Sequence, residues 1–329
     1  MIHFEPKDLP VPNVHQYLIG GIGPRPIALV STLSEDGIPN LTPFSFFNAF
    51  GANPPIIAFS PSRRGRTASL KNSYINLMKT RECVVQVVTY SIVEQVNIAS
   101  AEYPFEVNEF GKSGLTPINS DLVKPFRVKE SPFQMECIMK EMRSFSEKGS
   151  AANIAICEVI KFHIAEDIID DGIIRPDLID LVGRMGADYY CRAINPNIFE
   201  LPQPRTRLCV GYDSLPNYIK QSHVFSANNI GKLASVEKIP DEDEYIKFLD
   251  GILAESVSGM EINQEAFYRY QRLNKYKDML KVALNLEYND YEKKKLFIEL
   301  TAKCALENNN VQFAWNTVHY LKKLNLITD

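Results

Sequence analysis

A change in residue pattern divides the chain, and it constrains the fold more than any other feature. From about Arg25 to Arg192, β-rich runs such as "PIALVST", "ECVVQVVTY" and "NIAICEVIKFHIAED" alternate with turn residues, whereas from about Pro240 the apolar residues follow helical spacing. Asp36-Gly37 lies between two β-rich runs and predicts a hairpin, because glycine accepts the positive φ that such turns require. Strands joined by hairpins close economically into an antiparallel barrel. We therefore expect a mainly β domain followed by helices.

A Pro-rich connector, "NPNIFELPQPRTR", separates the two parts. We place the boundary there, with residues 1–200 forming the β domain and residues 201–329 forming the connector and a helical region. Two segments inside the β domain, "ASLKNSYINLMKT" and "SIVEQVNIASAEY", are predicted to be helical. The acidic run at 241–244 predicts a helix start, since carboxylates there complement the helix dipole. The last helical segment has an apolar face that indicates a core or dimer contact: Val311, Ala314, Trp315, Val318 and Leu321.

The composition is that of a globular protein. With 329 residues, 45% hydrophobic and 23% charged, the chain can bury a substantial core. A formal net charge of -4 gives no support for binding to nucleic acid or to an anionic membrane. No apolar run is long enough to cross a bilayer. Six cysteines without a C-x-x-C motif, and an N-terminus without the features of a signal peptide, lead us to expect a reducing cytoplasm.

The sequence lacks the common motifs of nucleotide binding, of hydrolytic catalysis and of metal binding. "GGIGPRP" precedes a strand and contains two prolines, which is not the context of a dinucleotide-binding turn. No G-x-x-x-x-G-K-[ST] loop and no G-x-S-x-G elbow occur. The five histidines have no metal-binding spacing, so we expect no metal site. We assign no catalytic side chain.

One basic run does indicate a ligand. In "SPSRRGRTASLKNSYINL", fork-shaped guanidinium groups, an ammonium group and several hydroxyls gather between a strand end and a helix start. Phosphate oxygens accept charge-assisted, bidentate hydrogen bonds from such groups, and helix-start amides add further donors. A solvated basic turn is the alternative interpretation of this run.

The stretch "TPFSFFNAF" precedes that run by one strand and mixes apolar with polar residues. Strand alternation sends Phe44, Phe46 and Asn48 to one face and Ser45 and Phe47 to the other. Such a strand suits a flat ligand whose ring edge carries carbonyl and imide groups. A ring system with a phosphate tail describes flavin mononucleotide (FMN) in outline. Packing of the aromatic residues in a core is the alternative.

A family resemblance rests on several ordered blocks. They include "GPRPIALVSTLSEDGIPNLTPFSFFNAFGANPPIIAFSPSRR", "KNSYINLMKTRECVVQVV" and "DLVGRMGADYYCR", and they extend from about Leu18 to Arg192. In order and approximate spacing these blocks resemble the flavin reductase-like family with the FMN-binding split-barrel fold, in the branch of the flavoredoxin-like proteins. The resemblance implies an antiparallel split β-barrel with flanking helices, followed here by an α-helical C-terminal extension outside the family pattern.

The resemblance also implies site residues. Around the flavin ring it places Arg25, Thr42, Ser45, Phe46, Phe47 and Asn48. Around the phosphate it places Ser60, Arg63, Arg64 and Lys71. Where the family usually has Lys-Asp-Thr, this chain has Lys71-Asn72-Ser73, which removes a negative charge beside the phosphate and keeps a hydroxyl on Ser73. Gly186, in "GRMGADYY", would permit close backbone approach near the cofactor, although an ordinary glycine turn is an equal alternative.

Two functions remain open from the sequence. The first is a flavin reductase in which NADH or NADPH gives hydride to bound FMN, and the electrons then pass to free flavin, oxygen or a redox partner protein. The second is a non-catalytic FMN electron carrier that a partner protein reduces. By resemblance we expect a homodimer with the flavin close to the interface, and we expect "SAEYPFEVNEFGKSGLT" to be partly interface.

Overall fold

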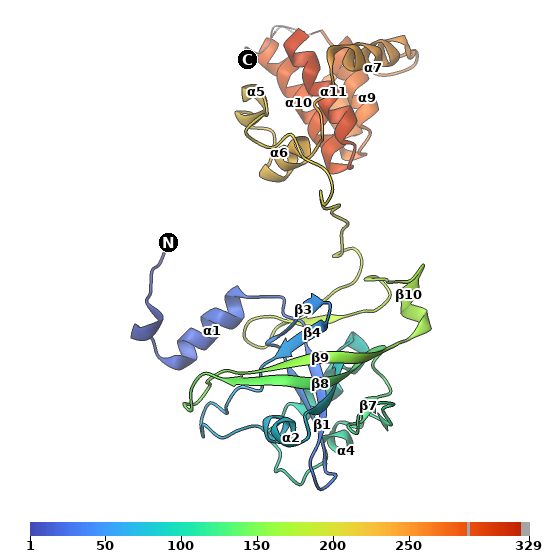
Figure 1. Cartoon of the computed structure of the whole chain (residues 1–329). Coiled ribbons are helices and arrows are strands. Elements are labelled where there is room, and N and C mark those ends of the chain that lie inside the picture. The colour runs from blue at the N-terminus through green and yellow to red at the C-terminus, as the bar shows by residue number, and fades with distance from the viewer. Residues whose placement is uncertain (288–289, 324–329) are drawn as a thin grey trace. The chain divides into compact units, whose positions relative to one another are not determined.

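The computed structural model describes residues 1–287 and 290–323. The chain divides into two compact units, Met1–Glu200 and Leu201–Asp329, and each is described by itself (Figure 1). Among the described residues, no helix combines the length and the apolar character that a membrane span requires.

One antiparallel sheet of seven strands forms the centre of the first unit, in the order β2-β1-β5-β8-β9-β4-β3 (Figure 1). The strands are β1 (Ala28–Leu33), β2 (Pro39–Phe44), β3 (Phe47–Ala52), β4 (Pro55–Phe59), β5 (Glu82–Val87), β8 (Phe133–Ser144) and β9 (Asn153–Ile164). The β-rich runs quoted above lie in these strands, so the predicted antiparallel sheet is confirmed.

The hairpin between β1 and β2 turns at the predicted position. Gly37 has a φ of +82°, which favours glycine. Its N–H donates to the Ser34 carbonyl at 3.0 Å, and Ser34 N–H donates to the Ile38 carbonyl at 3.0 Å. The turn sets the register in which Leu33 pairs with Pro39.

The two edge strands β2 and β3 are neighbours in the chain, with only Ser45 and Phe46 between them. Three Cα–Cα steps span about 11 Å at most, so the sheet must curl until its edges approach each other. The expectation of one continuous strand from Thr42 to Asn48 is therefore wrong, because the chain leaves the strand conformation at Ser45 and Phe46. As a consequence, Phe44 and Phe47 pack in the same core cluster instead of on opposite faces.

Apolar clusters cover both faces of the central strands. Ala28 and Val30 of β1 pack with Phe59 and Val85 in one cluster. Leu29, which points the other way because strand side chains alternate, packs in a second cluster. Strand β1 is thus buried on both faces, and its polar residues Ser31 and Thr32 are buried as well.

Helices and short strand pairs flank the sheet. The helices are η1 (Pro6–Asp8), α1 (Val11–Gly21), α2 (Asn72–Thr80), η2 (Tyr90–Ile92), α3 (Val93–Ala99), α4 (Glu109–Ser113) and η3 (Glu166–Ile168). The short pairs are β6 (Pro117–Ile118) with β7 (Arg127–Val128), β10 (Ile169–Asp170) with β11 (Ile173–Ile174), and β12 (Val182–Arg184) with β13 (Tyr190–Arg192). Helices α2 and α3 lie within the two segments predicted to be helical.

The second unit is helical, as predicted. Its helices are α5 (Asn217–Lys220), α6 (Ala227–Ala234), α7 (Glu242–Ala254), α8 (Gln264–Arg272), α9 (Tyr276–Asn285), α10 (Tyr291–Glu307) and α11 (Val311–Lys323). Asp241 caps α7 by accepting a hydrogen bond from Glu244 N–H at 3.1 Å, which confirms the predicted helix start. The predicted apolar face of α11 is core: Trp315 is fully buried and donates its Nε1–H to the Leu233 carbonyl at 3.0 Å.

Candidate functional site

The basic loop after β4 folds back on itself before it enters α2. Arg64 N–H donates to the Ser69 carbonyl at 3.0 Å, and Ala68 N–H donates to the Arg64 carbonyl at 2.9 Å. The Arg63 guanidinium donates to the Ala68 carbonyl at 2.8 Å, and the Arg64 guanidinium donates to the Leu70 carbonyl at 2.7 Å. Both arginines are half-buried and help to shape the loop, so the loop is not a simple solvated turn.

A small pocket lies where this loop meets β2, the start of α2 and the segment after α3. Its lining residues are Asn40, Thr42, Arg64, Lys71, Asn72, Ser100, Ala101, Glu102, Tyr103 and Glu109. Thr42, Arg64 and Lys71 are the predicted site residues that the fold brings together here. The cavity volume is about 20 Å³, which is close to the room that one water needs. The pocket is partly open to solvent, and its enclosed part alone is smaller than a phosphate group.

Two cations, Arg64 and Lys71, line this pocket together with the carboxylates of Glu102 and Glu109. Burial first, and then the charge of Arg64, lower the pKa of Lys71 below its ordinary value, while Glu102 acts in the opposite direction. The Lys71 ammonium lies 5.2 Å from the centroid of the Phe44 ring. Arg64 Nε lies 3.6 Å from Glu102 Oε1. Because Lys71 is partly removed from water, an anion that reaches it gains more than it would at an open surface.

The beginning of α2 adds donors beside these cations. Lys71 is the N-cap residue, and no side chain caps the helix start. The first-turn N–H groups therefore lack a side-chain acceptor. Ser73, in the same turn, is fully buried, and its Oγ has no hydrogen-bond partner among the described residues. This donor set fits an anionic group. Ser73 is not one of the residues that line the pocket, but its unpartnered hydroxyl belongs to the same helical turn.

A chain of hydrogen-bonded buried polar side chains leads to two residues of the pocket wall, Asn40 and Glu109. Asn76 Nδ2 donates to Thr32 Oγ1 at 3.0 Å, and Thr32 Oγ1 donates to Asn40 Oδ1 at 3.2 Å. Asn40 Nδ2 then donates to Glu109 Oε1 at 2.9 Å. These bonds connect α2, β1, β2 and α4, so they fix the position of the pocket wall.

The residues predicted for the flavin ring lie at the break between β2 and β3. Phe46 is 38% exposed. Its ring lies 6.0 Å from the guanidinium carbon of Arg25 and 6.2 Å from the ring of His15. Ser45 is half-buried and Asn48 is exposed. The side-chain oxygen Oδ1 of Asn48 accepts a hydrogen bond from Ala49 N–H at 2.8 Å. Phe47 instead packs against the core. Of the aromatic residues predicted for the ring, Phe46 is therefore the one that can offer a face to a ligand, while Phe50 farther along β3 is exposed as well.

Arg25 has a structural role that the sequence did not indicate. Its guanidinium donates to the carbonyls of Ile19 at 2.6 Å, Ile22 at 2.5 Å and Met185 at 2.9 Å. The end of α1 is thereby attached to the segment that follows β12. Arg25 has little donor capacity left for a ligand, although its Nε has no partner among the described residues.

Gly186 and Ser60 also lie outside the pocket lining. A Cβ on Gly186 would come within 2.9 Å of Gly20 Cα, so the close backbone approach at this glycine is to α1. Ser60 Oγ lies 2.9 Å from Ser62 Oγ, and Ser60 N–H donates to the Phe46 carbonyl at 2.9 Å. Ser60 thus joins the beginning of the basic loop to the ring segment.

Glu102, Tyr103 and Glu109 line the pocket although no feature of the sequence predicted it. They belong to the stretch that we expected to be partly interface, and no motif distinguishes them. Their position depends on the packing of α3 and α4 against β2, which a single sequence does not reveal. Leu41 of β2, Val96 of α3 and Phe110 of α4 share one buried apolar cluster, which is part of that packing.

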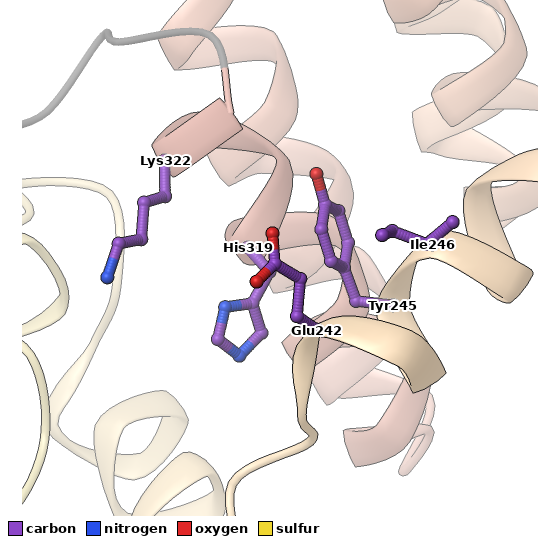
Figure 2. A pocket seen from close by; sticks show the side chains of 5 residues that line it. All are labelled: Glu242, Tyr245, Ile246, His319 and Lys322. Carbon is purple, nitrogen blue, oxygen red and sulfur yellow. The ribbon is translucent and has the colours of Figure 1, made fainter.

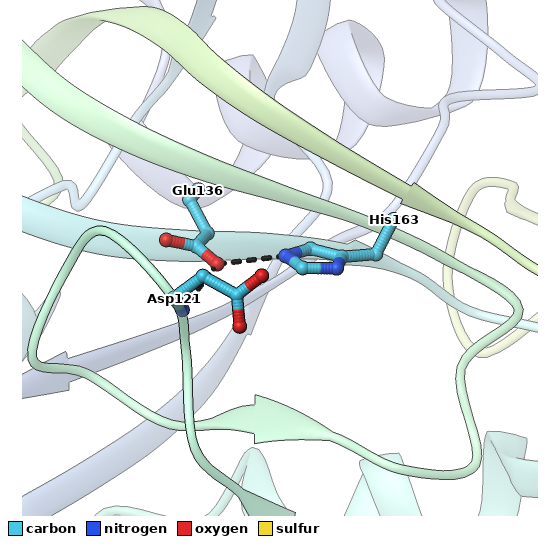
Figure 3. Close-up of side chains that lie close together, drawn as sticks. All are labelled: Asp121, Glu136 and His163. Carbon is cyan, nitrogen blue, oxygen red and sulfur yellow. Dashed lines mark hydrogen bonds and ion pairs between the residues drawn. The ribbon is translucent and has the colours of Figure 1, made fainter.

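A separate cluster joins Asp121, Glu136 and His163, whose ligand-type atoms lie within 4.8 Å of one another (Figure 3). Fully buried Glu136 accepts from the N–H groups of Asp121 at 2.8 Å, Leu122 at 2.6 Å and Val123 at 3.1 Å, and its Oε1 lies 2.7 Å from His163 Nε2. These bonds anchor a loop. Histidine spacing could not have predicted the cluster, because the three residues meet only through the fold.

A larger cavity of about 390 Å³ lies in the second unit between α7 and α11 (Figure 2). Its lining residues are Glu242, Tyr245, Ile246, His319 and Lys322. The Tyr245 and His319 rings lie 5.9 Å apart. Burial, with a smaller contribution from Lys322, lowers the pKa of His319. None of the predicted site residues lies in this cavity.

The first unit is an antiparallel sheet domain with flanking helices, and the comparisons with known proteins agree with that fold class. The family model described as "Flavin reductase like domain" matches residues 21–181. A protein of Aquifex aeolicus, described as uncharacterized, is 34% identical over 193 residues, which are 58% of this chain and 96% of that protein. This chain therefore belongs to the flavin reductase-like family.

Solved structures are similar over the same part of the chain. Nitrilotriacetate monooxygenase component B from Bacillus cereus is 30% identical, with a TM-score of 0.58 over 61% of this chain and 98% of that one. A protein with a split barrel domain from Shewanella frigidimarina is 25% identical, with a TM-score of 0.53 over 62% and 100%. The family model ends at residue 181, so the second unit lies outside it.

Proposed function

We propose that the first unit is a split barrel that binds FMN and that the protein is an NAD(P)H-dependent flavin reductase. The observation that carries this proposal is the pairing of Arg64 and Lys71 with the uncapped start of α2 in one pocket, within a chain of the flavin reductase-like family. We also propose residues 1–200 as the flavin domain and residues 201–329 as a separate helical region.

The phosphate of FMN would bind at this pocket. Arg64 and Lys71 supply charge, and the first-turn amides of α2 and the Ser73 hydroxyl supply further donors. Arg63 would act indirectly, by holding the loop through its bond to the Ala68 carbonyl. In this arrangement the loop positions the cations before the ligand arrives, which reduces the cost of ordering them.

The ring would lie along the break between β2 and β3. Phe46 would offer an aromatic face, and Thr42, Ser45 and Asn48 would offer polar groups to the ring edge. When bound, FMN supplies the hydride and electron transfer chemistry. The chain itself needs to bind, orient and partly shield the ring, so a catalytic acid or base is not required of these residues.

A homodimer and a cytoplasmic location are further parts of the proposal. Helix α1 buries only Ile19 within the chain and exposes Val11, Tyr17 and Leu18. An apolar helix surface of this kind suits contact with a second copy. All six cysteines are unpaired, which fits a reducing compartment.

The test begins with the purified full-length protein. A yellow protein that releases FMN on denaturation, identified by chromatography, would support the flavin site, and a protein that cannot be loaded with FMN would refute it. Anaerobic addition of NADH and of NADPH then separates the two functions. Rapid loss of the yellow colour supports the reductase. If a chemical reductant reduces the flavin but neither nucleotide does, the reductase proposal fails. The protein is then better described as an FMN electron carrier that a partner protein reduces.

A further inference from the structure

We propose that Glu102 competes with the ligand's phosphate for Arg64, and that it thereby sets how tightly the chain holds FMN relative to flavins without a phosphate. The inference rests on the proposed flavin site and goes beyond it, because it concerns how that site selects and releases its ligand. Three features of the pocket carry it: an ion pair, a charge balance and a lack of space.

In the ion pair between Arg64 and Glu102, Arg64 is held in place by the fold and Glu102 is exposed to solvent. Glu102 Oε1 lies 3.6 Å from Arg64 Nε. The Arg64 side chain is 19% exposed, and the Leu70 carbonyl holds it through a 2.7 Å hydrogen bond. The Glu102 side chain is 69% exposed and has Arg64 as its one ion-pair partner within the described residues. Exposed ion pairs are weak, so Glu102 can move away from Arg64 at little cost.

The charges of the pocket balance before any ligand is considered. Arg64 and Lys71 face Glu102 and Glu109 across the same cavity. Glu109 is fixed, since Asn40 Nδ2 and Leu41 N–H donate to its two oxygens at 2.9 and 3.1 Å. A phosphate monoester carries a charge of about -1.5 to -2 at neutral pH. Of the two carboxylates, Glu102 is the one that a phosphate can replace.

The small enclosed volume of the pocket favours the same exchange. It is about 20 Å³, so a phosphate gains room inside the pocket when the Glu102 carboxylate moves outward. Glu102 and Tyr103 belong to the segment after α3, which forms one wall. An outward movement of the Glu102 carboxylate makes room in the pocket. The same movement breaks the ion pair with Arg64, so that the guanidinium can bind the phosphate. Riboflavin, which has no phosphate, needs neither change.

The experiment measures flavin affinity, not turnover. Wild type, Glu102→Gln and Glu102→Ala are stripped of flavin and titrated with FMN and with riboflavin, following quenching of flavin fluorescence. The matched control is Glu106→Gln, an exposed carboxylate four positions along the same segment. We expect both Glu102 variants to bind FMN about threefold to fivefold more tightly than wild type, with riboflavin affinity changed less than twofold. The control should match wild type with both ligands.

The double variant Arg64→Gln/Glu102→Gln completes the test. If the two residues compete as proposed, Glu102→Gln has little effect once Arg64 is absent. Unchanged or weaker FMN binding in the Glu102 variants overturns the inference and leaves the flavin site standing. Equal tightening of FMN and riboflavin also overturns it, since Glu102 would then act on the ring. A wild type that binds neither flavin overturns the proposed function itself.

Discussion

Asn40 and Glu109 are joined by a 2.9 Å hydrogen bond from the side-chain amide to the carboxylate, and this bond attaches β2 to α4 beside the cation-lined pocket. The second carboxylate oxygen accepts from Leu41 N–H at 3.1 Å. Even so, burial outweighs these bonds and raises the pKa of Glu109 above its ordinary value of 4.5. The pocket therefore contains a carboxylate whose ionisation the fold opposes.

This raised pKa predicts a pH effect on stability. The folded state holds the Glu109 proton more tightly than the unfolded state, so ionisation costs stability as pH rises from about 4.5 through the raised pKa. We expect the unfolding free energy of wild type, relative to Glu109→Gln, to fall over that range. Urea unfolding at several pH values measures it, with Glu106→Gln as the control. A difference between wild type and Glu109→Gln that does not change with pH would contradict the prediction.

Charge removal in the pocket should weaken FMN binding. We expect Arg64→Gln and Lys71→Gln each to lose about 1.5–3 kcal/mol of FMN affinity, since each removes a charge-assisted bond to the phosphate. Arg66→Gln is the matched control, because Arg66 is an exposed cation of the same loop outside the pocket lining. Titration with FMN and riboflavin measures the effect. An equal loss with riboflavin would place these residues away from the phosphate.

Much of the architecture could be predicted because it depends on local signals. The Asp36-Gly37 turn and the β-rich runs identified the sheet, and helical spacing identified the apolar face that contains Trp315. The break at Ser45 and Phe46 could not be predicted, because a strand pattern continues through it and only the closing of the curled sheet interrupts it. The spacing of apolar residues along one strand does not show that the two edges of the sheet must approach each other.

The site was predicted less completely than the fold. The basic run predicted which residue types gather beside the start of α2, but Arg63 and Arg64 are adjacent and identical in type, and of these two only Arg64 lines the pocket. Which of two arginines bonds to the Ala68 carbonyl is decided by loop geometry. The family resemblance placed Arg25 and Gly186 near the cofactor, and the fold shows contacts of both residues with the end of α1, which the sequence did not indicate.

The anchored loop at Glu136 predicts a pH effect of the opposite sign. Burial alone raises the pKa of Glu136, but the hydrogen bonds from Asp121 N–H, His163, Leu122 N–H and Val123 N–H outweigh it, so the pKa lies below 4.5. Its stabilising contribution is therefore present above pH 4.5 and is lost as pH falls through the lowered pKa.

We expect Glu136→Gln to cost about 2–4 kcal/mol near neutral pH, and the cost to shrink in acid. Urea unfolding monitored by circular dichroism measures this cost. Glu141→Gln, an exposed change on the same strand β8, is the control and should have little effect. A cost that grows as pH falls would show that the sign is wrong.

The contact between Gly186 and Gly20 makes a further prediction about α1. An alanine at position 186 would place its Cβ 2.9 Å from Gly20 Cα, so the end of α1 must shift. We expect Gly186→Ala to cost about 1–3 kcal/mol and to increase amide hydrogen exchange in residues 11–21. Gly111→Ala is the control, because a Cβ there meets no atom within 4 Å. Unchanged exchange in α1 would mean that this contact does not hold the helix.

The cysteines differ in burial, and their reactivity should follow it. Cys83, Cys137, Cys157 and Cys304 are buried, whereas Cys191 and Cys209 are partly exposed. Hydrogen bonds between thiols, together with burial, raise the pKa of Cys83 and Cys157, and burial raises the pKa of Cys304.

Because the thiolate is the reactive form, we expect Ellman's reagent to modify only Cys191 and Cys209 quickly in the native protein and all six cysteines in denaturant. The double variant Cys191→Ser/Cys209→Ser should show no fast phase. A fast phase that survives in this variant would mean that the buried thiols are reached through local opening of the sheet or of the helical unit.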